Sequence, residues 1–69
     1  MISNGTFLLN GHKFSITKNL TLNQLLDYLG YRNFLFIVEC NGVVCHRKEW
    51  DKEIKPNDII EIISIVGGG

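Results

Sequence analysis

Alternation and turn signals at the start of the chain predict a β-hairpin. Residues 6–10 are extended and apolar, and residues 12–17 alternate, with Phe14 and Ile16 on one face. The Asn-Gly pair between these segments is the dipeptide that most favours a two-residue hairpin turn. We therefore predict that the first part of the chain folds back on itself as two antiparallel strands.

The next segment changes to the period of a helix. Thr21 can cap the helix through its hydroxyl, and Gln24, three residues later, completes a capping box. Gly30 supplies the left-handed residue at which helices often end. Four leucines between these caps form one apolar stripe, which we expect to be buried. They are Leu22, Leu25, Leu26 and Leu29.

The second half of the chain predicts another hairpin and a final strand. Residues 34–40 and 43–45 flank a second Asn-Gly turn. A short helical turn within 46–53 is expected to place Trp50 on the core, and a tight turn containing Pro56 follows it. Residues 59–66 are rich in β-branched side chains and almost continuously apolar, which favours a strand at the centre of the sheet.

These elements predict an α+β domain over residues 1–66. A single helix of useful length must cover one face of one mixed sheet of about five strands. The other face is then left without a covering layer. On that face Val44, Ile63 and Ile65 are expected to form an exposed apolar patch, and such patches mark interfaces. We interpret this patch as a docking surface for a partner protein.

Composition and charge narrow the function classes. The chain has 69 residues and no formal net charge, and its cations are interleaved with acids, so it lacks the basic stripe of a nucleic-acid-binding module. Neither a membrane span nor a secretory leader is indicated. A domain this short has a marginal core and little room for a closed catalytic cavity. We expect a monomer when free, with no catalytic residues and no metal site.

Two cysteines flank the second Asn-Gly turn. A two-residue turn places Cys40 and Cys45 diagonally across the hairpin, with Cα atoms roughly 7–8 Å apart. That separation is outside the usual range for a disulfide, so we expect two reduced, buried thiols. The alternative is a reactive thiol activated by a nearby cation such as His46 or Arg47.

The most unusual feature is the run of three glycines, Gly67, Gly68 and Gly69, after the last strand. Glycine loses more conformational freedom on ordering than any other residue, so these glycines do not stabilise the fold. We interpret residues 67–69 as a flexible tail that can enter a narrow slot in a partner. The acyl carbon of Gly69 is unhindered, and its carboxylate becomes reactive once it is activated, for example as an acyl-adenylate.

The chain resembles the ThiS family of sulfur carriers, which have the ubiquitin-like β-grasp fold. The resemblance covers nearly the whole chain after residue 6. Its more specific parts are the Arg-x-x-Trp element ending at Trp50 and the Val-Gly-Gly-Gly run ending at Gly69. Two turn positions depart from the family pattern, with His46 where proline is common and Asn57 where glycine is usual.

The resemblance implies a function in thiamin (thiazole phosphate) biosynthesis. An E1-like adenylyltransferase (ThiF-like) would adenylate the Gly69 carboxylate with ATP, and a persulfide donor would convert it to a thiocarboxylate. A thiazole synthase (ThiG-like) would receive the sulfur. The carrier itself is then a co-substrate without a bound cofactor, and not an enzyme. Separately from the resemblance, the many isoleucine, asparagine and lysine residues suggest an AT-rich genome, and we expect a cytoplasmic location, in a bacterial cytosol or a plastid stroma.

Three alternatives share this fold. The first is a sulfur carrier for molybdopterin synthesis, which would co-purify with a larger synthase subunit. The second is a ubiquitin-like modifier, which would form higher-mass conjugates with other proteins. The third is a β-grasp interaction module whose function survives removal of Gly68 and Gly69.

Overall fold

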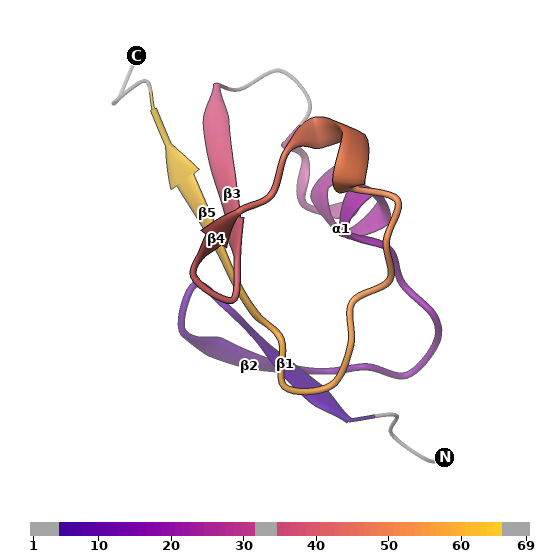
Figure 1. Ribbon diagram of the computed structural model, residues 1–69. Helices are drawn as coiled ribbons and strands as arrows, with labels where there is room; N and C mark the ends of the chain where they lie inside the picture. Colours follow the sequence, from indigo (N-terminus) through magenta and orange to yellow (C-terminus); the bar gives the residue numbers. More distant parts are fainter. Residues whose placement is uncertain (1–4, 32–34, 66–69) are drawn as a thin grey trace.

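The computed structural model describes residues 5–31 and 35–65 (Figure 1). The predicted tail at 67–69 lies outside these residues, as do Phe34 and Val66, the expected outer ends of two strands. The elements of the described residues follow the expected order. They are β1 (Thr6–Leu9), β2 (His12–Ser15), α1 (Leu22–Leu29), β3 (Phe36–Cys40), β4 (Val43–Val44), a 3-10 helix (Arg47–Glu49) and β5 (Ile59–Ser64).

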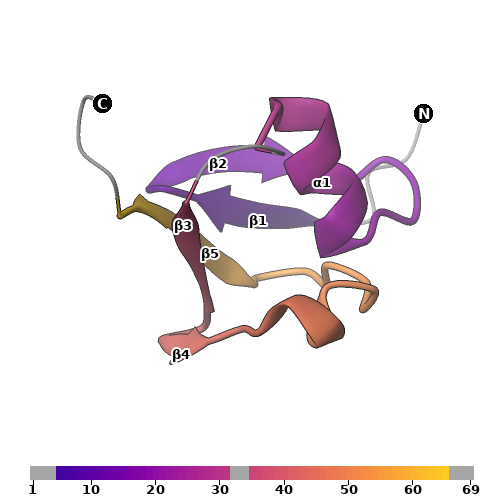
Figure 2. The same cartoon turned by 90° about the horizontal axis from the view of Figure 1, so that it is seen from above.

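The five strands form one mixed sheet in the order β2-β1-β5-β3-β4. β5 is central, as predicted, and pairs parallel with β1 and antiparallel with β3. α1 packs across one face of this sheet (Figure 2). The β-grasp architecture expected from the sequence is therefore confirmed. β3 and β5 are shorter than predicted, because their ladder runs only from the Phe36–Ser64 pair to the Cys40–Ile60 pair.

Both Asn-Gly turns have the left-handed geometry that the sequence predicts. The φ angles are 51° at Asn10 and 56° at Asn41, and both following glycines are at 84°. This is the backbone of a type I′ hairpin turn. The side-chain Oδ1 of Asn10 accepts a hydrogen bond from the N–H of Ile62 (2.8 Å), and that of Asn41 accepts from Ile59 (2.9 Å). The two turns thus also hold the backbone of the central strand.

The two turn asparagines differ in one contact, which predicts a difference in stability. The Nδ2 of Asn41 also donates to Oδ1 of Asp58 (3.1 Å). Asn41→Asp replaces this hydrogen bond by two facing carboxylates, so we expect the free energy of unfolding to fall by about 1 kcal/mol at neutral pH. Asn10→Asp keeps the oxygen that its turn uses and is the matched control. Urea unfolding at neutral and acidic pH checks this: equal losses for the two variants, or a loss that persists after carboxyl protonation, would contradict it.

The caps of α1 are formed as predicted. The Thr21 hydroxyl accepts from the N–H of Gln24 (3.1 Å), whose side-chain oxygen accepts from the N–H of Thr21 (2.9 Å). Gly30 ends the helix with φ 86°. The prediction that all four leucines are buried is wrong for Leu29, which is 40% exposed. Leu29 instead borders a hollow beside Ser64, at the end of the helix.

Trp50 lies on the core as expected. Its ring stacks on Phe36 with centroids 5.5 Å apart, and its Nε1 donates to the carbonyl of Cys45 (3.0 Å). The Arg47 guanidinium lies over the Trp50 ring, 5.3 Å from the ring centroid. The buried core itself is apolar throughout the described residues. It consists of Phe7, Leu9, Ile16, Leu22, Leu25, Leu26, Val38, Cys40, Cys45, Ile54, Ile60 and Ile62.

Candidate functional site

The face of the sheet opposite α1 carries exposed apolar side chains from the central strand. Along β5, Ile60 and Ile62 are buried beneath α1, so their odd-numbered neighbours point to the other face. Val44, Ile63 and Ile65 are 44%, 45% and 57% exposed. The structure therefore exposes the three apolar residues that the sequence assigned to a docking patch.

The strand register brings two further apolar residues to this surface. Ile37 on β3 lies directly opposite Ile63, and the carbonyl of Leu35 accepts a hydrogen bond from the N–H of Ile65 (3.0 Å). Both side chains are exposed. Neither residue was predicted as part of the patch, although alternation along β3 gives the signal. We call the enlarged surface the outer patch. It consists of Leu35, Ile37, Val44, Ile63 and Ile65.

Two carboxylates lie on the same face as the outer patch. Glu39 on β3 is paired with Glu61 on β5 on one side and with Val44 on β4 on the other. Like charges directly opposite each other on a sheet repel, so this arrangement lowers the stability of the sheet. It is suited to a partner that offers apolar side chains to Ile63 and a cation to the two glutamates.

The structure fixes the direction of β5, the strand that precedes the tail in the sequence. β5 is paired on both sides near its start, and β3 accompanies it up to Ser64. Its far end points away from the loop that carries Pro56 (Figure 1). Ser64 also lines a hollow of about 340 Å³ with Leu29, Gly30 and Tyr31. Gly67, Gly68 and Gly69 lie outside the described residues, only a few positions beyond this fixed point.

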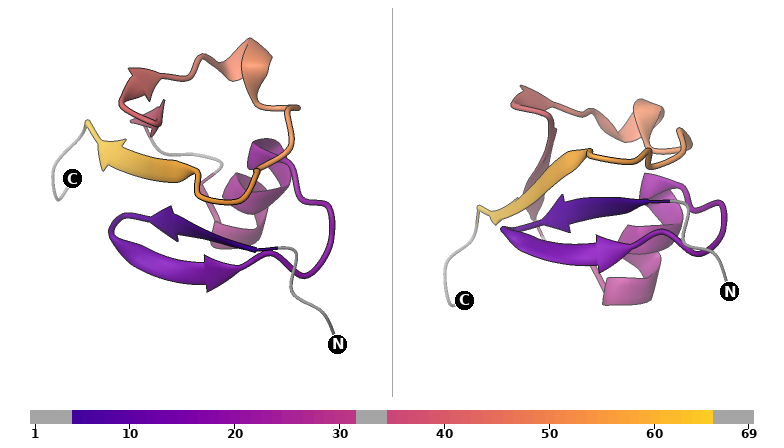
Figure 3. Two further views of the ribbon diagram at one scale, coloured as in Figure 1. Left: turned by 60° about the horizontal axis from the view of Figure 1, so that its bottom comes forward. Right: turned by 90° about the horizontal axis from the view of Figure 1, so that it is seen from below.

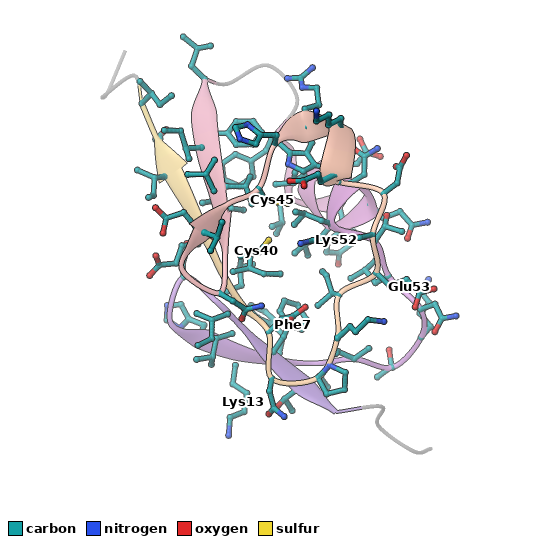
Figure 4. All side chains as sticks on the ribbon, viewed as in Figure 1. Phe7, Lys13, Cys40, Cys45, Lys52 and Glu53 are labelled. Atoms are coloured by element: carbon teal, nitrogen blue, oxygen red, sulfur yellow. The ribbon has the colours of Figure 1, made fainter. Side chains whose placement is uncertain are left out.

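The two cysteines are free and buried, which confirms the prediction of reduced thiols. Both belong to the buried core, Cys40 at the end of β3 and Cys45 directly after β4 (Figure 4). Burial, with a smaller contribution from the hydrogen bond to Cys45, raises the pKa of the Cys40 thiol from 9.0 to about 11. The cation that acts on Cys40 is Lys52, not His46 or Arg47, and its opposing effect is the smaller one. Cys40 therefore stays protonated at neutral pH and lacks the thiolate that a nucleophile needs.

The raised pKa of Cys40 predicts a loss of stability in alkaline solution. Between pH 9 and about 11 the folded protein keeps the Cys40 proton, whereas the unfolded chain releases it. Because the unfolded state then binds fewer protons, the free energy of unfolding should fall as pH rises through this window and should not change on this account below it. Urea unfolding at several pH values in this window should show that the free energy of unfolding falls less steeply with pH in Cys40→Ala than in the wild-type protein. An unchanged slope in that variant would contradict the assignment to Cys40.

The described residues bring together no group of three or more His, Cys, Asp or Glu side chains that could hold a metal ion. In the same part of the chain, no helix has the length and apolar character needed to cross a bilayer.

Comparison with known proteins agrees with this geometry. A model of the ThiS family matches residues 7–69, which is nearly the whole chain and includes the three terminal glycines. The chain belongs to the ThiS family. A crystal structure of the thiamine biosynthesis protein ThiS from Geobacter metallireducens matches with a TM-score of 0.73 and 28% sequence identity. The match covers 93% of this chain and 99% of that one.

Similar sequences are also known among proteins described as uncharacterized protein ycf40. The protein from Trieres chinensis is 42% identical over 65 residues, covering 93% of this chain and 89% of the relative. The protein from Pyropia yezoensis is 32% identical over 68 residues, covering 97% and 96%. The ThiS-family match and the ThiS structure together support a role as a sulfur carrier with the ubiquitin-like β-grasp fold.

Proposed function

We propose that the protein carries sulfur as a thiocarboxylate on Gly69 and donates it to a ThiG-like thiazole synthase in thiamin (thiazole phosphate) biosynthesis. The observation that carries this proposal is the ThiS-family match over residues 7–69, which runs through Gly67 and Gly68 to Gly69. The solved relative described as a thiamine biosynthesis protein supports the same pathway.

The proposed chemistry takes place on the Gly69 carboxylate in the sites of partner enzymes. A carboxylate oxygen attacks the α-phosphorus of ATP on an E1-like, ThiF-like adenylyltransferase, and pyrophosphate leaves. The terminal sulfur of a persulfide donor then attacks the acyl carbon of this mixed anhydride, and AMP leaves. A thiol cleaves the resulting acyl disulfide, which gives the thiocarboxylate and oxidises the thiol to a disulfide. Glycine suits this position because no side chain shields the acyl carbon from the nucleophile.

In this proposal the folded domain presents the tail and is not itself an enzyme. ATP belongs to the adenylyltransferase, and the carrier holds no cofactor of its own. The outer patch docks that enzyme, since it combines exposed apolar side chains with the strand that leads to the tail. We further propose a free monomer in an aqueous compartment, a bacterial cytosol or a plastid stroma.

Intact-mass measurement tests the proposed function. The full chain is incubated with ATP, a persulfide donor and its cognate adenylyltransferase, and a sample without ATP is the control. We expect a mass gain equal to the exchange of one oxygen for sulfur, located on Gly69 by fragmentation. If an enzyme that modifies another carrier leaves this chain unchanged, the proposal is wrong. Conjugates of higher mass would instead identify a protein modifier.

A further inference from the structure

Two glutamates lie directly opposite each other in the part of the sheet that carries the outer patch. The N–H of Asn41 donates to the carbonyl of Ile59 (2.7 Å), and hydrogen-bonded pairs recur at every second residue of an antiparallel ladder. Glu39 and Glu61 are the next pair of this kind, so their Cα atoms lie about 5.5 Å apart. The two side chains therefore leave the sheet side by side, on the face opposite α1.

No cation of the described residues offsets these two carboxylates. Glu39 is half-buried, with Glu61 on one side and Val44 on the other, and Glu61 is exposed. Neither carboxylate forms a hydrogen bond or an ion pair within residues 5–31 and 35–65. A carboxylate that is partly desolvated beside a like charge raises the free energy of the folded state. The stability of the free domain therefore gives no reason for this pair, whereas docking of a positively charged group gives one.

Lys13 lies on the same face of the sheet but is separated from the glutamates. It is the only lysine or arginine in the described strands. Lys13 is paired with Leu8, which is paired in turn with Ile59, so the width of β1 and two positions along β5 separate it from Glu61 (Figure 3). Its side chain projects away from the core at the β2 edge (Figure 4). The glutamates and the outer patch thus share one half of this face, and Lys13 lies in the other.

This arrangement selects among the possible occupants of the outer patch. A second copy docked through the same face would bring its own Glu39 and Glu61 against these two, since a twofold contact joins the same surface of both copies. The Gly69 carboxylate is also negative, so the tail of the chain does not suit the pair. A guanidinium does suit it, because it offers five N–H donors in one plane. It is also more weakly hydrated than an ammonium, which fits a site bordered by Val44 and Ile63.

We propose that Glu39 and Glu61 together hold the guanidinium of one arginine from the partner that docks on the outer patch. The inference rests on the proposed function, in which that partner is the ThiF-like adenylyltransferase. Each carboxylate accepts charge-assisted hydrogen bonds from one edge of the guanidinium, while the apolar side chains around the pair exclude water. The repulsion between the glutamates lowers the stability of the free carrier, and its relief on docking gives the complex affinity and specificity.

Glutamine substitutions test the pair, because they remove the charge and keep the length of each side chain. The affinity of the full chain for the intact cognate adenylyltransferase is measured by isothermal titration calorimetry at two salt concentrations, without a persulfide donor. We expect Glu39→Gln combined with Glu61→Gln to raise the Kd about thirtyfold and to reduce its dependence on salt. The same variant should unfold at a higher urea concentration than the wild-type protein, because the like charges are gone. A variant that gains stability and loses affinity cannot owe that loss to a damaged fold.

Glu53→Gln is the matched control for the change in net charge. Glu53 lies between the 3-10 helix and β5, on the other side of the molecule from β3 and β4 (Figure 4). Its substitution removes one carboxylate without touching the outer patch. The Kd for the adenylyltransferase should therefore stay unchanged.

The cation on the enzyme is identified by its protection from chemical modification. Arginines that the bound wild-type chain protects from phenylglyoxal are located by mass spectrometry, and each is replaced by alanine. One of these changes should raise the Kd for the wild-type chain about thirtyfold. It should leave the Kd for the double glutamine variant unchanged, because that variant has already lost the contact.

Several outcomes would overturn the inference. These are an unchanged Kd for the double glutamine variant, an equal loss of affinity in Glu53→Gln, and coupling of the pair to a lysine instead of an arginine. Self-association of the wild-type chain in the titration would also overturn it, because a second copy then occupies the patch. All of these leave the proposed function standing if the thiocarboxylate still forms. If the wild-type chain neither binds the enzyme nor gains sulfur, the proposed function fails together with this inference.

Discussion

Deletion of Gly69 should abolish formation of the thiocarboxylate while leaving the fold unchanged. In the proposed mechanism the partner places one carboxylate against the α-phosphorus of ATP, and the tail determines how far that carboxylate reaches beyond Ser64. One extended residue spans about 3.3–3.6 Å, and a displacement of that size removes the carboxylate from attacking distance. Intact mass after incubation with the adenylyltransferase, ATP and a persulfide donor should show no gain.

The stability of this deletion variant separates chemistry from folding. The ladders and the buried core lie within residues 5–65, so the free energy of unfolding should change by less than about 0.5 kcal/mol. Gly67→Ala is a milder change for comparison, because it keeps the length of the tail and adds only one methyl group to it. It should lower kcat/KM for adenylation without abolishing it. Formation of a thiocarboxylate on Gly68 of the shortened chain would contradict this prediction, because it would show that activation does not depend on the length of the tail.

Local chemistry explains which parts of the fold could be predicted from the sequence. The two Asn-Gly turns, the capping box at Thr21 and the stop at Gly30 depend on residues only a few positions apart, and all of them form as expected. The central place of β5 follows from its burial on the side of α1 and its apolar composition. Alternation along this strand also predicts correctly which of its side chains are exposed.

Features that depend on distant parts of the chain were missed. The asparagine side chains reach β5 across 52 and 18 positions of sequence, which no local pattern specifies. Leu29 belongs to the leucine stripe, but it lies at the end of the helix, so it is half exposed. The contribution of Leu35 and Ile37 to the outer patch depends on the register between β3 and β5. The predicted role of Gly69 still rests on the sequence and the family.

The outer patch should be required for activation by the adenylyltransferase. Val44→Asp combined with Ile63→Asp places two carboxylates beside Glu39 and Glu61, at the centre of the proposed interface. Loss of two well-packed apolar contacts, each worth about 2 kcal/mol, would lower kcat/KM by at least about a hundredfold. The measurement is the rate of ATP–pyrophosphate exchange that depends on the carrier, recorded at carrier concentrations well below saturation.

Two controls distinguish docking from damage to the sheet. Both mutated side chains are about half exposed, so each substitution should lower the free energy of unfolding by only about 1 kcal/mol through lost strand propensity. Ile59→Asp is the matched variant, because Ile59 lies on the same strand and is 46% exposed, at the end away from the tail. It should lose about half as much stability as the double variant and remain a substrate. Equal loss of activity in the two variants would assign the effect to the sheet, and full activity of the double variant would exclude the outer patch as the docking surface.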